Sequence, residues 1–133
     1  MNDVNDTQPT VVIADDNAGI LSAVAGLLRP SFTVVAQAKD GEAAFRAITE
    51  LRPRLAILDL SMPKINGFEV ARRLCKAQCA TRIVFLTLLA GEDFVTEARR
   101  YGHGYVTKTR LRSDLFPALS FALRGEFFAS DFK

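Results

Sequence analysis

Two kinds of hydrophobic pattern alternate along the chain. Short apolar runs, rich in β-branched residues and typical of strands buried on both faces, occur at Thr10–Ala14, Thr33–Ala36, Leu55–Leu58, Ile83–Thr87 and Gly104–Thr107. After each run, apolar residues recur at the three- and four-residue spacing of amphipathic helices. A strand followed by a helix, five times over, predicts an α/β fold with a doubly wound parallel sheet and helices on both faces.

Helix boundaries follow from prolines and capping residues. Pro30 and Pro53 lie just after the first two helical stripes, where a residue without a backbone N–H cannot continue a helix. Ser113 precedes the last helical stripe and is the expected N-cap. Pro117 would then lie in the first turn, where its missing N–H does little harm.

Composition limits the class of protein. A chain of 133 residues with 49% apolar and 24% charged residues predicts one globular domain. A net charge of +2 gives little support for binding a nucleic-acid backbone. No apolar stretch is long enough for a membrane helix, and the polar N-terminus lacks the features of a signal peptide, so we expect a cytoplasmic protein. Cys75 and Cys79 are expected to be reduced, and His103 is too remote from them in sequence to suggest a metal site.

Polar residues follow the predicted strands at one edge of the sheet. Asp15 and Asp16 follow the first strand, Asp59 follows the third, Thr87 ends the fourth and Lys108 follows the fifth. In this class of fold, chemistry gathers at the carboxyl ends of the strands. Each residue alone has an ordinary explanation, since Asp16 can cap a helix, Asp59 can start a turn and Lys108 can be a solvated lysine. The combination is much harder to explain as coincidence.

Three carboxylates in a small space predict a bound cation. Without one, their mutual repulsion would keep at least one of them protonated. Mg²⁺ prefers oxygen ligands of this kind, together with waters and a phosphate. A carboxylate in such a site can act as a nucleophile and form an aspartyl-phosphate, with a lysine and a hydroxyl to stabilise the transferred group.

Four segments give the chain a resemblance to a known family. VVIADDN, LAILDLSMPKINGFEV, IVFLTLL and GYVTK resemble the signature segments of the receiver domain of bacterial two-component response regulators, over a match from Val11 to Arg124. The segments DLSMP, GYVTK and ALRGEFFAS are most similar to those of the subclass with a C-terminal helix-turn-helix (LuxR/NarL-like) output domain. The resemblance implies a flavodoxin-like (βα)5 fold with a five-stranded sheet in the order 2-1-3-4-5.

The resemblance also implies a metal site and a phosphoacceptor. Asp59 would accept a phosphoryl group from a histidine kinase. Asp15 and Asp16 would bind Mg²⁺ together with Asp59 and the main-chain carbonyl of Ser61. The domain would be a signalling switch and not an enzyme in the usual sense, although it could catalyse its own phosphotransfer and dephosphorylation.

The remaining roles concern the response to phosphorylation. Lys108 and Thr87 would bind the phosphoryl oxygens. Thr87 would move toward the phosphoryl group, and Tyr105 would swing inward as space opens. Ser61 and Leu89 would flank the site and tune the hydrolysis rate through access for water.

The domain limits and partners follow from the same resemblance. We expect a flexible segment over 1–9, the receiver domain over 10–125 and a tail over 126–133 that could begin a linker to a missing output domain. Phe127, Phe128 and Phe132 make this tail apolar, which suggests packing on its own domain, a second copy or a missing domain. A phosphorylation-dependent homodimer is expected, with DNA bound only through a missing C-terminal domain that controls transcription.

Four alternatives remain. A stand-alone receiver would act by protein–protein interaction or in a phosphorelay. A flavodoxin-like nucleotide-binding module is disfavoured because the carboxylates of the DDNAG loop would repel a phosphate and no glycine-rich phosphate loop is present. A phosphatase with an aspartyl-phosphate intermediate would typically have an aspartate where Ser61 stands. Direct nucleic-acid binding would use Arg72-Arg73, Arg99-Arg100 and Arg110/Arg112, although such pairs are usually solvated.

Overall fold

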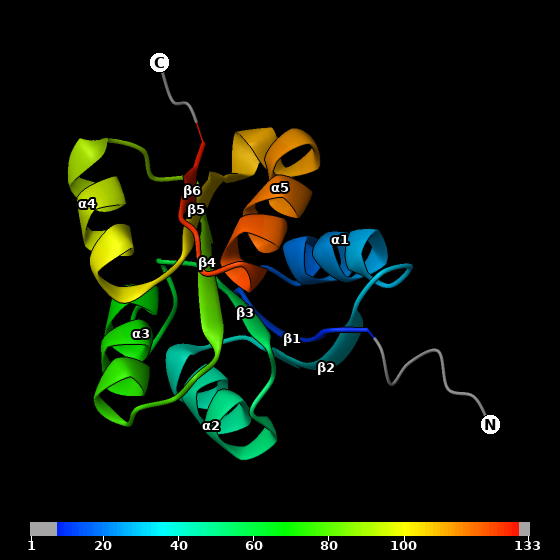
Figure 1. Ribbon diagram of the computed structural model, residues 1–133. Coiled ribbons are helices and arrows are strands. Elements are labelled where there is room, and N and C mark those ends of the chain that lie inside the picture. The colour runs from blue at the N-terminus through cyan, green and yellow to red at the C-terminus, as the bar shows by residue number, and fades with distance from the viewer. Residues whose placement is uncertain (1–7, 131–133) are drawn as a thin grey trace.

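The molecule has three layers, with a parallel sheet between two layers of helices (Figure 1). The structure is a computed structural model and describes residues 8–130. Most of the expected N-terminal segment and the end of the tail, including Phe132, lie outside the described residues. No helix within 8–130 is both long and apolar enough to cross a membrane.

The elements alternate as the sequence predicts. The strands are β1 (Thr10–Ala14), β2 (Thr33–Ala38), β3 (Leu55–Leu58), β4 (Arg82–Thr87), β5 (Gly104–Thr107) and β6 (Phe128–Ala129). The helices are α1 (Ala18–Leu28), α2 (Gly41–Leu51), α3 (Gly67–Lys76), α4 (Glu92–Tyr101) and α5 (Leu111–Leu123). A 3₁₀ turn at Lys108–Arg110 joins β5 to α5.

The sheet order is β2-β1-β3-β4-β5-β6, and all neighbouring strands are parallel. The predicted order 2-1-3-4-5 is confirmed. The predicted count of five strands is wrong for the described residues, because the tail adds the two-residue strand β6 beside β5. So short a strand gives no recognisable hydrophobic pattern in the sequence.

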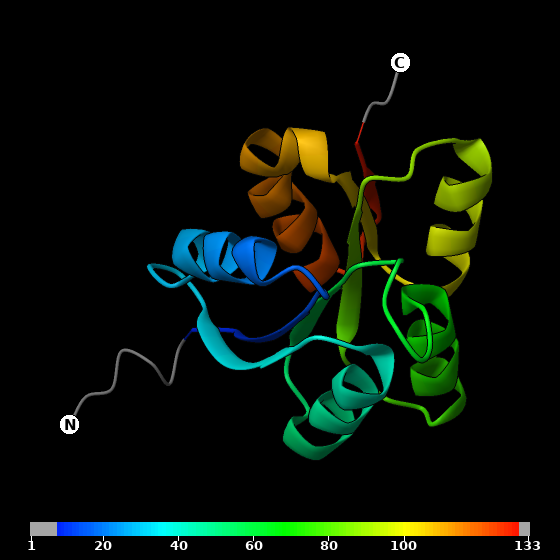
Figure 2. The same ribbon diagram turned by 180° about the vertical axis from the view of Figure 1, so that it is seen from behind.

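The helices bury the sheet on both faces. Figures 1 and 2 show α1 and α5 on one face and α2, α3 and α4 on the other. Alternate residues of each strand therefore enter two different cores. In β1, Val11 and Ile13 pack with α1 and α5, while Val12 and Ala14 pack with the opposite helices.

Three helices begin with a side-chain cap. Asn17, Asp40 and Asn66 each accept a hydrogen bond from the backbone N–H three residues further on. These bonds satisfy N–H groups that a helix start leaves without a partner. The caps fix α1 and α3 directly after the loops that carry Asp15 and Asp59.

The start of the last helix differs from the prediction. α5 begins at Leu111, so Ser113 is inside the helix and not its N-cap, and Pro117 lies beyond the first turn. The cause is the 3₁₀ turn at Lys108–Arg110, which leads directly into the helix. The Ser113 hydroxyl instead donates to the Asp114 carboxylate at 2.9 Å, with the Arg110 carbonyl oxygen 3.3 Å away.

The described part of the tail packs on its own domain. Phe127 lies beneath the guanidinium of Arg99 in α4, 4.2 Å from its ring centre, and Phe128 packs edge-on against Phe121 in α5. Both contacts use aromatic faces that a solvated tail would leave exposed. The tail thus bridges the helices on either side of β5.

Candidate functional site

The polar strand ends lie at the carboxyl edge of the sheet. Backbone hydrogen bonds fix two of them, because Asp15 N–H donates to the Ala38 carbonyl and Asp59 N–H donates to the Ala14 carbonyl. Asp15 and Asp59 are thereby held on neighbouring strands. The sheet order also reverses between β1 and β3, which is where such folds place their sites.

A glycine allows α3 to approach this edge. A Cβ atom on Gly67 would lie 2.4 Å from the carbonyl oxygen of Asp59, which is closer than any side chain tolerates. The Gly67 N–H donates to the Leu60 carbonyl at 3.0 Å and closes the loop between β3 and α3. This loop contains Ser61, two residues after Asp59.

The three aspartates form one cluster. Asp15, Asp16 and Asp59 each have a carboxylate oxygen within 4.8 Å of the others. Asp15 and Asp59 are buried, with 1% and 4% exposure, whereas Asp16 is exposed. It is the one group of three His, Cys, Asp or Glu side chains within 8–130 that could bind a metal.

Lys108 supplies positive charge to the cluster. Its Nζ lies 2.8 Å from Asp15 Oδ2 and 3.4 Å from Asp59 Oδ2. Burial alone would lower the pKa of Lys108, but the two carboxylates outweigh it and raise the pKa above its ordinary value. The side chain is therefore a permanent ammonium group at neutral pH.

One lysine does not balance the carboxylates. Burial, followed by repulsion from Asp15, raises the pKa of Asp59 above its ordinary value despite the opposing effects of Lys108 and a backbone contact from Ser61. An ionised Asp59 is therefore electrostatically unfavourable in the fold, and a second cation near it would relieve the repulsion.

The donors fit a hard divalent cation. Every candidate ligand atom is an oxygen, and Asp15 Oδ2 is buried without a hydrogen-bond partner beyond its ion pair with Lys108. Mg²⁺ prefers one or two carboxylates of this kind and keeps several waters, for which the exposed Asp16 side leaves room. The carbonyl of Ser61 stays a prediction as a ligand.

The predicted switch residues meet in the loop after β4. The buried Thr87 hydroxyl accepts a hydrogen bond from the N–H of Leu89 at 3.1 Å. The Tyr105 hydroxyl donates to the carbonyl of the same leucine. The ring of Tyr105 is fully buried, which raises the pKa of its hydroxyl. Tyr105 therefore has the inward position in this structure, and its predicted swing is not tested by one state.

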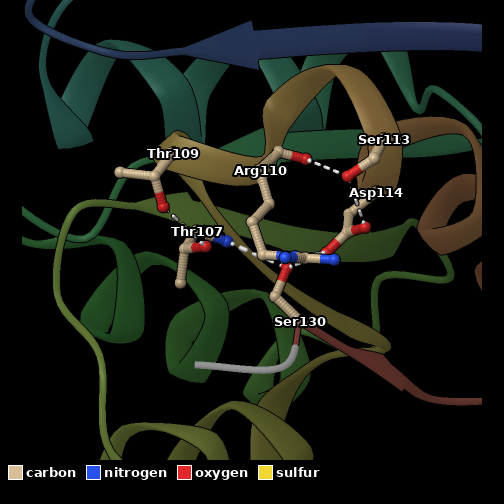
Figure 3. A network of polar contacts seen from close by, with 6 residues as sticks. All are labelled: Thr107, Thr109, Arg110, Ser113, Asp114 and Ser130. Atoms are coloured by element: carbon tan, nitrogen blue, oxygen red, sulfur yellow. Dashed lines mark hydrogen bonds and ion pairs between the residues drawn. The ribbon is translucent and has the colours of Figure 1, made fainter. Parts of the chain in front are cut away.

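A second polar group was not predicted from the sequence. Asp114 in α5 and Ser130 after β6 are both buried and hydrogen-bonded to each other (Figure 3). Nothing in their spacing of 16 residues signals contact, because a helix and a turn separate them. An aspartate in a helix and a serine just after a two-residue strand form no short sequence motif.

Comparison with known proteins agrees with this geometry. A family model described as the response regulator receiver domain matches residues 11–120. The uncharacterized transcriptional regulatory protein YvfU of Bacillus subtilis is 35% identical over 86% of this chain and 58% of its own length. The nitrate/nitrite response regulator NarL of Escherichia coli is 34% identical over 96% of this chain and 60% of its own length.

A solved structure of a receiver domain has the same fold. The signal receiver domain of a response regulator NarL from Mycobacterium tuberculosis superposes with a TM-score of 0.84 at 28% identity, covering 90% of this chain and 98% of that one. The chain spans about three-fifths of the length of the two curated relatives. The family model covers most of the chain, and both relatives exceed 30% identity, so this chain belongs to the response regulator receiver domain family.

Proposed function

We propose that the domain is a phosphorylation-activated switch of a two-component system, with Asp59 as the phosphoacceptor. The observation that carries the proposal is the buried Asp15–Asp59–Lys108 cluster, in which two carboxylates share one ammonium group and burial, together with Asp15, raises the pKa of Asp59. Such a cluster is unfavourable as a purely structural feature, and it suits a cation and a transferred phosphoryl group.

Phosphoryl transfer requires one bond change at phosphorus. A carboxylate oxygen of Asp59 attacks the phosphorus, the bond from phosphorus to the donor breaks, and the donor leaves with its electron pair. With a phosphohistidine donor the leaving group is the imidazole of the kinase. With acetyl phosphate it is acetate. Mg²⁺ on Asp15, Asp16, Asp59 and the Ser61 carbonyl would neutralise charge developing on the phosphoryl oxygens.

Lys108 and Thr87 are the residues of this chain that would receive the product. Phosphorylation adds a charge of about −1.5 to −2 and three acceptor oxygens next to the Lys108 ammonium. Its Nζ would exchange a carboxylate partner for a phosphoryl oxygen. The Thr87 hydroxyl, which accepts from Leu89 N–H, would move to donate its proton to another phosphoryl oxygen, and this movement would break the contact with Leu89.

Release of this loop offers a route to an output. Leu89 contacts Thr87 through its N–H and Tyr105 through its carbonyl. A movement of Thr87 therefore changes the support of Tyr105 and of the α4 side of the domain. We propose that this surface controls transcription through a further C-terminal domain, as the regulatory relatives suggest, and that the kinase is a histidine kinase. The stand-alone receiver remains the alternative output.

Intact-mass measurement tests the chemistry. Wild-type protein incubated with acetyl phosphate and Mg²⁺ should gain one phosphoryl group, which hydroxylamine should remove because an acyl phosphate is cleaved by it. Asp59→Ala should remain unmodified, whereas the control Asp93→Ala, at an exposed aspartate in α4, should be modified normally. An adduct that persists in Asp59→Ala, or a folded wild type modified neither by acetyl phosphate nor by any phosphorylated histidine kinase, would refute the proposal.

Sedimentation tests the proposed phosphorylation-dependent homodimer. Beryllium trifluoride with Mg²⁺ serves as a stable analogue of the phosphoryl group. Wild type should sediment as a monomer alone and as a dimer with the analogue, while Asp59→Ala stays monomeric. A monomer under both conditions, despite bound analogue, would contradict the homodimer.

A further inference from the structure

A buried polar network joins the tail to the end of β5. Ser130 Oγ donates to Asp114 Oδ2 at 2.6 Å and accepts the N–H of Thr107 at 3.2 Å (Figure 3). The backbone N–H of Ser130 donates to the Tyr105 carbonyl at 2.8 Å. One serine therefore contacts β5 at two points.

The direction of these hydrogen bonds is fixed by Asp114. Its Oδ2 also accepts from Arg110 Nε at 3.0 Å, and its Oδ1 accepts from the Ser113 hydroxyl at 2.9 Å. Burial alone would raise the pKa of Asp114, but these three donors lower it below its ordinary value, so the group is a carboxylate and accepts only. The Ser130 proton must then point to Asp114, and a lone pair faces the Thr107 N–H.

The position of Thr107 gives this contact its importance. The ladder between β5 and β6 ends at Tyr105 and Ala129, and the Ser130 side chain supplies an acceptor where strand pairing stops. Thr107 is the last residue of β5, and Lys108 follows it directly. The backbone from which the Lys108 side chain reaches Asp15 and Asp59 is therefore held from the outer side of the sheet by the tail.

We propose that Ser130, oriented by Asp114, is a positioning residue for Lys108 in phosphoryl-group binding. This inference rests on the proposed function. Without the serine hydroxyl, the end of β5 loses its outer hydrogen bond, and the Lys108 ammonium occupies a wider range of positions. The tail beyond the region matched by the family model would then be part of the machinery for phosphoryl binding.

The test measures binding of beryllium trifluoride and of Mg²⁺ separately, by amide NMR. Ser130→Ala should weaken beryllium trifluoride binding about fivefold, the value of one buried hydrogen bond of ordinary strength. Ser130→Thr keeps the hydroxyl and should restore binding. Ser120→Ala, which removes an exposed hydroxyl from α5, is the matched control and should bind as wild type.

The affinity for Mg²⁺ distinguishes a positioning role of Ser130 from a general loss of structure at the site. Lys108 is itself a cation paired with the carboxylates that would bind Mg²⁺, so a displaced Lys108 does not weaken Mg²⁺ binding, and Ser130→Ala should keep or raise Mg²⁺ affinity even if the variant is less stable. In a Lys108→Ala background, Ser130→Ala should cause no further loss of beryllium trifluoride affinity, because the two residues act through one interaction. Additive losses in the double variant would overturn the proposal.

Three further results would each refute a different part of the proposal. Unchanged beryllium trifluoride affinity in a folded Ser130→Ala protein would overturn the positioning role and leave the proposed function intact. A parallel loss of Mg²⁺ and beryllium trifluoride affinity would assign Ser130 a general structural role. A wild type that binds neither ligand would refute the proposed function itself.

Linkage provides an independent check. If the docked tail strengthens beryllium trifluoride binding fivefold, the bound analogue must stabilise the docked tail by the same factor. Hydrogen exchange at the Ser130 amide should therefore slow by about fivefold on binding. An exchange rate that does not respond to the analogue would contradict coupling between the tail and the site.

Discussion

Asp59 and Asp114 are two buried carboxylates with opposite electrostatics. They are 4% and 6% exposed, so burial is nearly the same for both. Burial raises the pKa of Asp59, and the facing Asp15 raises it further, whereas hydrogen bonds from Ser130, Ser113 and Arg110 outweigh burial at Asp114 and lower its pKa. The difference lies in the donors around each group. A buried carboxylate whose donors outweigh burial stabilises the fold, and one whose donors do not is suited to bind a cation or a phosphoryl group.

The largest expected effect comes from removing the satisfied carboxylate. Asp114→Ala leaves the buried Ser130 hydroxyl without its acceptor and Arg110 without its partner, and should lower the free energy of unfolding by about 2–4 kcal/mol. Chemical denaturation measures the loss. Asp93→Ala, at an exposed aspartate, should cost far less. Equal losses for the two variants would show that the network does not fasten the tail.

Mg²⁺ should stabilise the site at Asp59, where the donors do not offset burial and the repulsion from Asp15. At a free concentration of about one hundred times its Kd, Mg²⁺ should raise the free energy of unfolding of wild type by about 2.7 kcal/mol. Asp114→Asn should gain as much from Mg²⁺ as wild type gains, because its carboxyl lies in the other network. Asp59→Ala should gain less. A full gain in Asp59→Ala would place the cation elsewhere.

Neutralising Asp59 should stabilise the protein in the absence of Mg²⁺. Asp59→Asn removes one of two facing charges and should raise the free energy of unfolding at pH 7 by on the order of 1 kcal/mol. The variant is expected to be inactive as a phosphoacceptor, so stability and function change in opposite directions. Denaturation in a metal chelator measures the gain. A destabilised Asp59→Asn would mean that the ionised group is satisfied after all.

The pH dependence of the two carboxylates should have opposite signs. For Asp59 the raised pKa favours the folded state at low pH, and this contribution is lost as the pH rises through the folded-state pKa. For Asp114 the lowered pKa favours the folded state above the ordinary aspartate range, and this contribution is lost as the pH falls through the folded-state pKa.

Denaturation of Asp59→Asn and Asp114→Asn across the acidic range, without Mg²⁺, measures both signs. The stabilising effect of Asp59→Asn should fade as the pH falls through the raised pKa of Asp59 and be lost by about pH 3.9, the ordinary aspartate value. The cost of Asp114→Asn should also shrink toward low pH. If the change in the free energy of unfolding caused by either substitution does not vary with pH, the charge assigned to that carboxylate is wrong.

The smallest expected effect concerns one donor to Asp114. Ser113 is exposed, so water can replace its hydroxyl when Ser113→Ala removes it. The free energy of unfolding should fall by about 0.5 kcal/mol, at the low end for a hydrogen bond. Ser130→Ala, which removes a buried donor, should lower the free energy of unfolding by more. A larger loss for Ser113→Ala than for Ser130→Ala would reverse this order of importance.

The carboxyl-edge cluster was predictable because parallel strands share a direction. Asp15, Asp59, Thr87 and Lys108 each follow or end a recognisable apolar run, and a parallel sheet brings such residues to one edge. The assignment needed no knowledge of loop geometry. The family resemblance rests on segments that contain the same residues.

The Asp114–Ser130 network could not be predicted for a physical reason. Its contacts depend on where α5 begins, and the 3₁₀ turn places that start before Ser113, which by capping rules looked like the N-cap. They depend also on β6, which is too short to show a strand pattern. The inward position of Tyr105 could not be predicted either, because it belongs to one conformational state and no sequence pattern specifies that state.

The strand β6 also protects the molecule from other chains. β5 is fully buried on both faces, and without a neighbour its outer edge would expose unpaired N–H and C=O groups to any extended segment. Such an edge is a template for aggregation or for strand exchange between copies. The two residues of β6 occupy it within the same chain. Loss of the tail would therefore favour edge-to-edge association, which is a separate consequence from any change in phosphoryl binding.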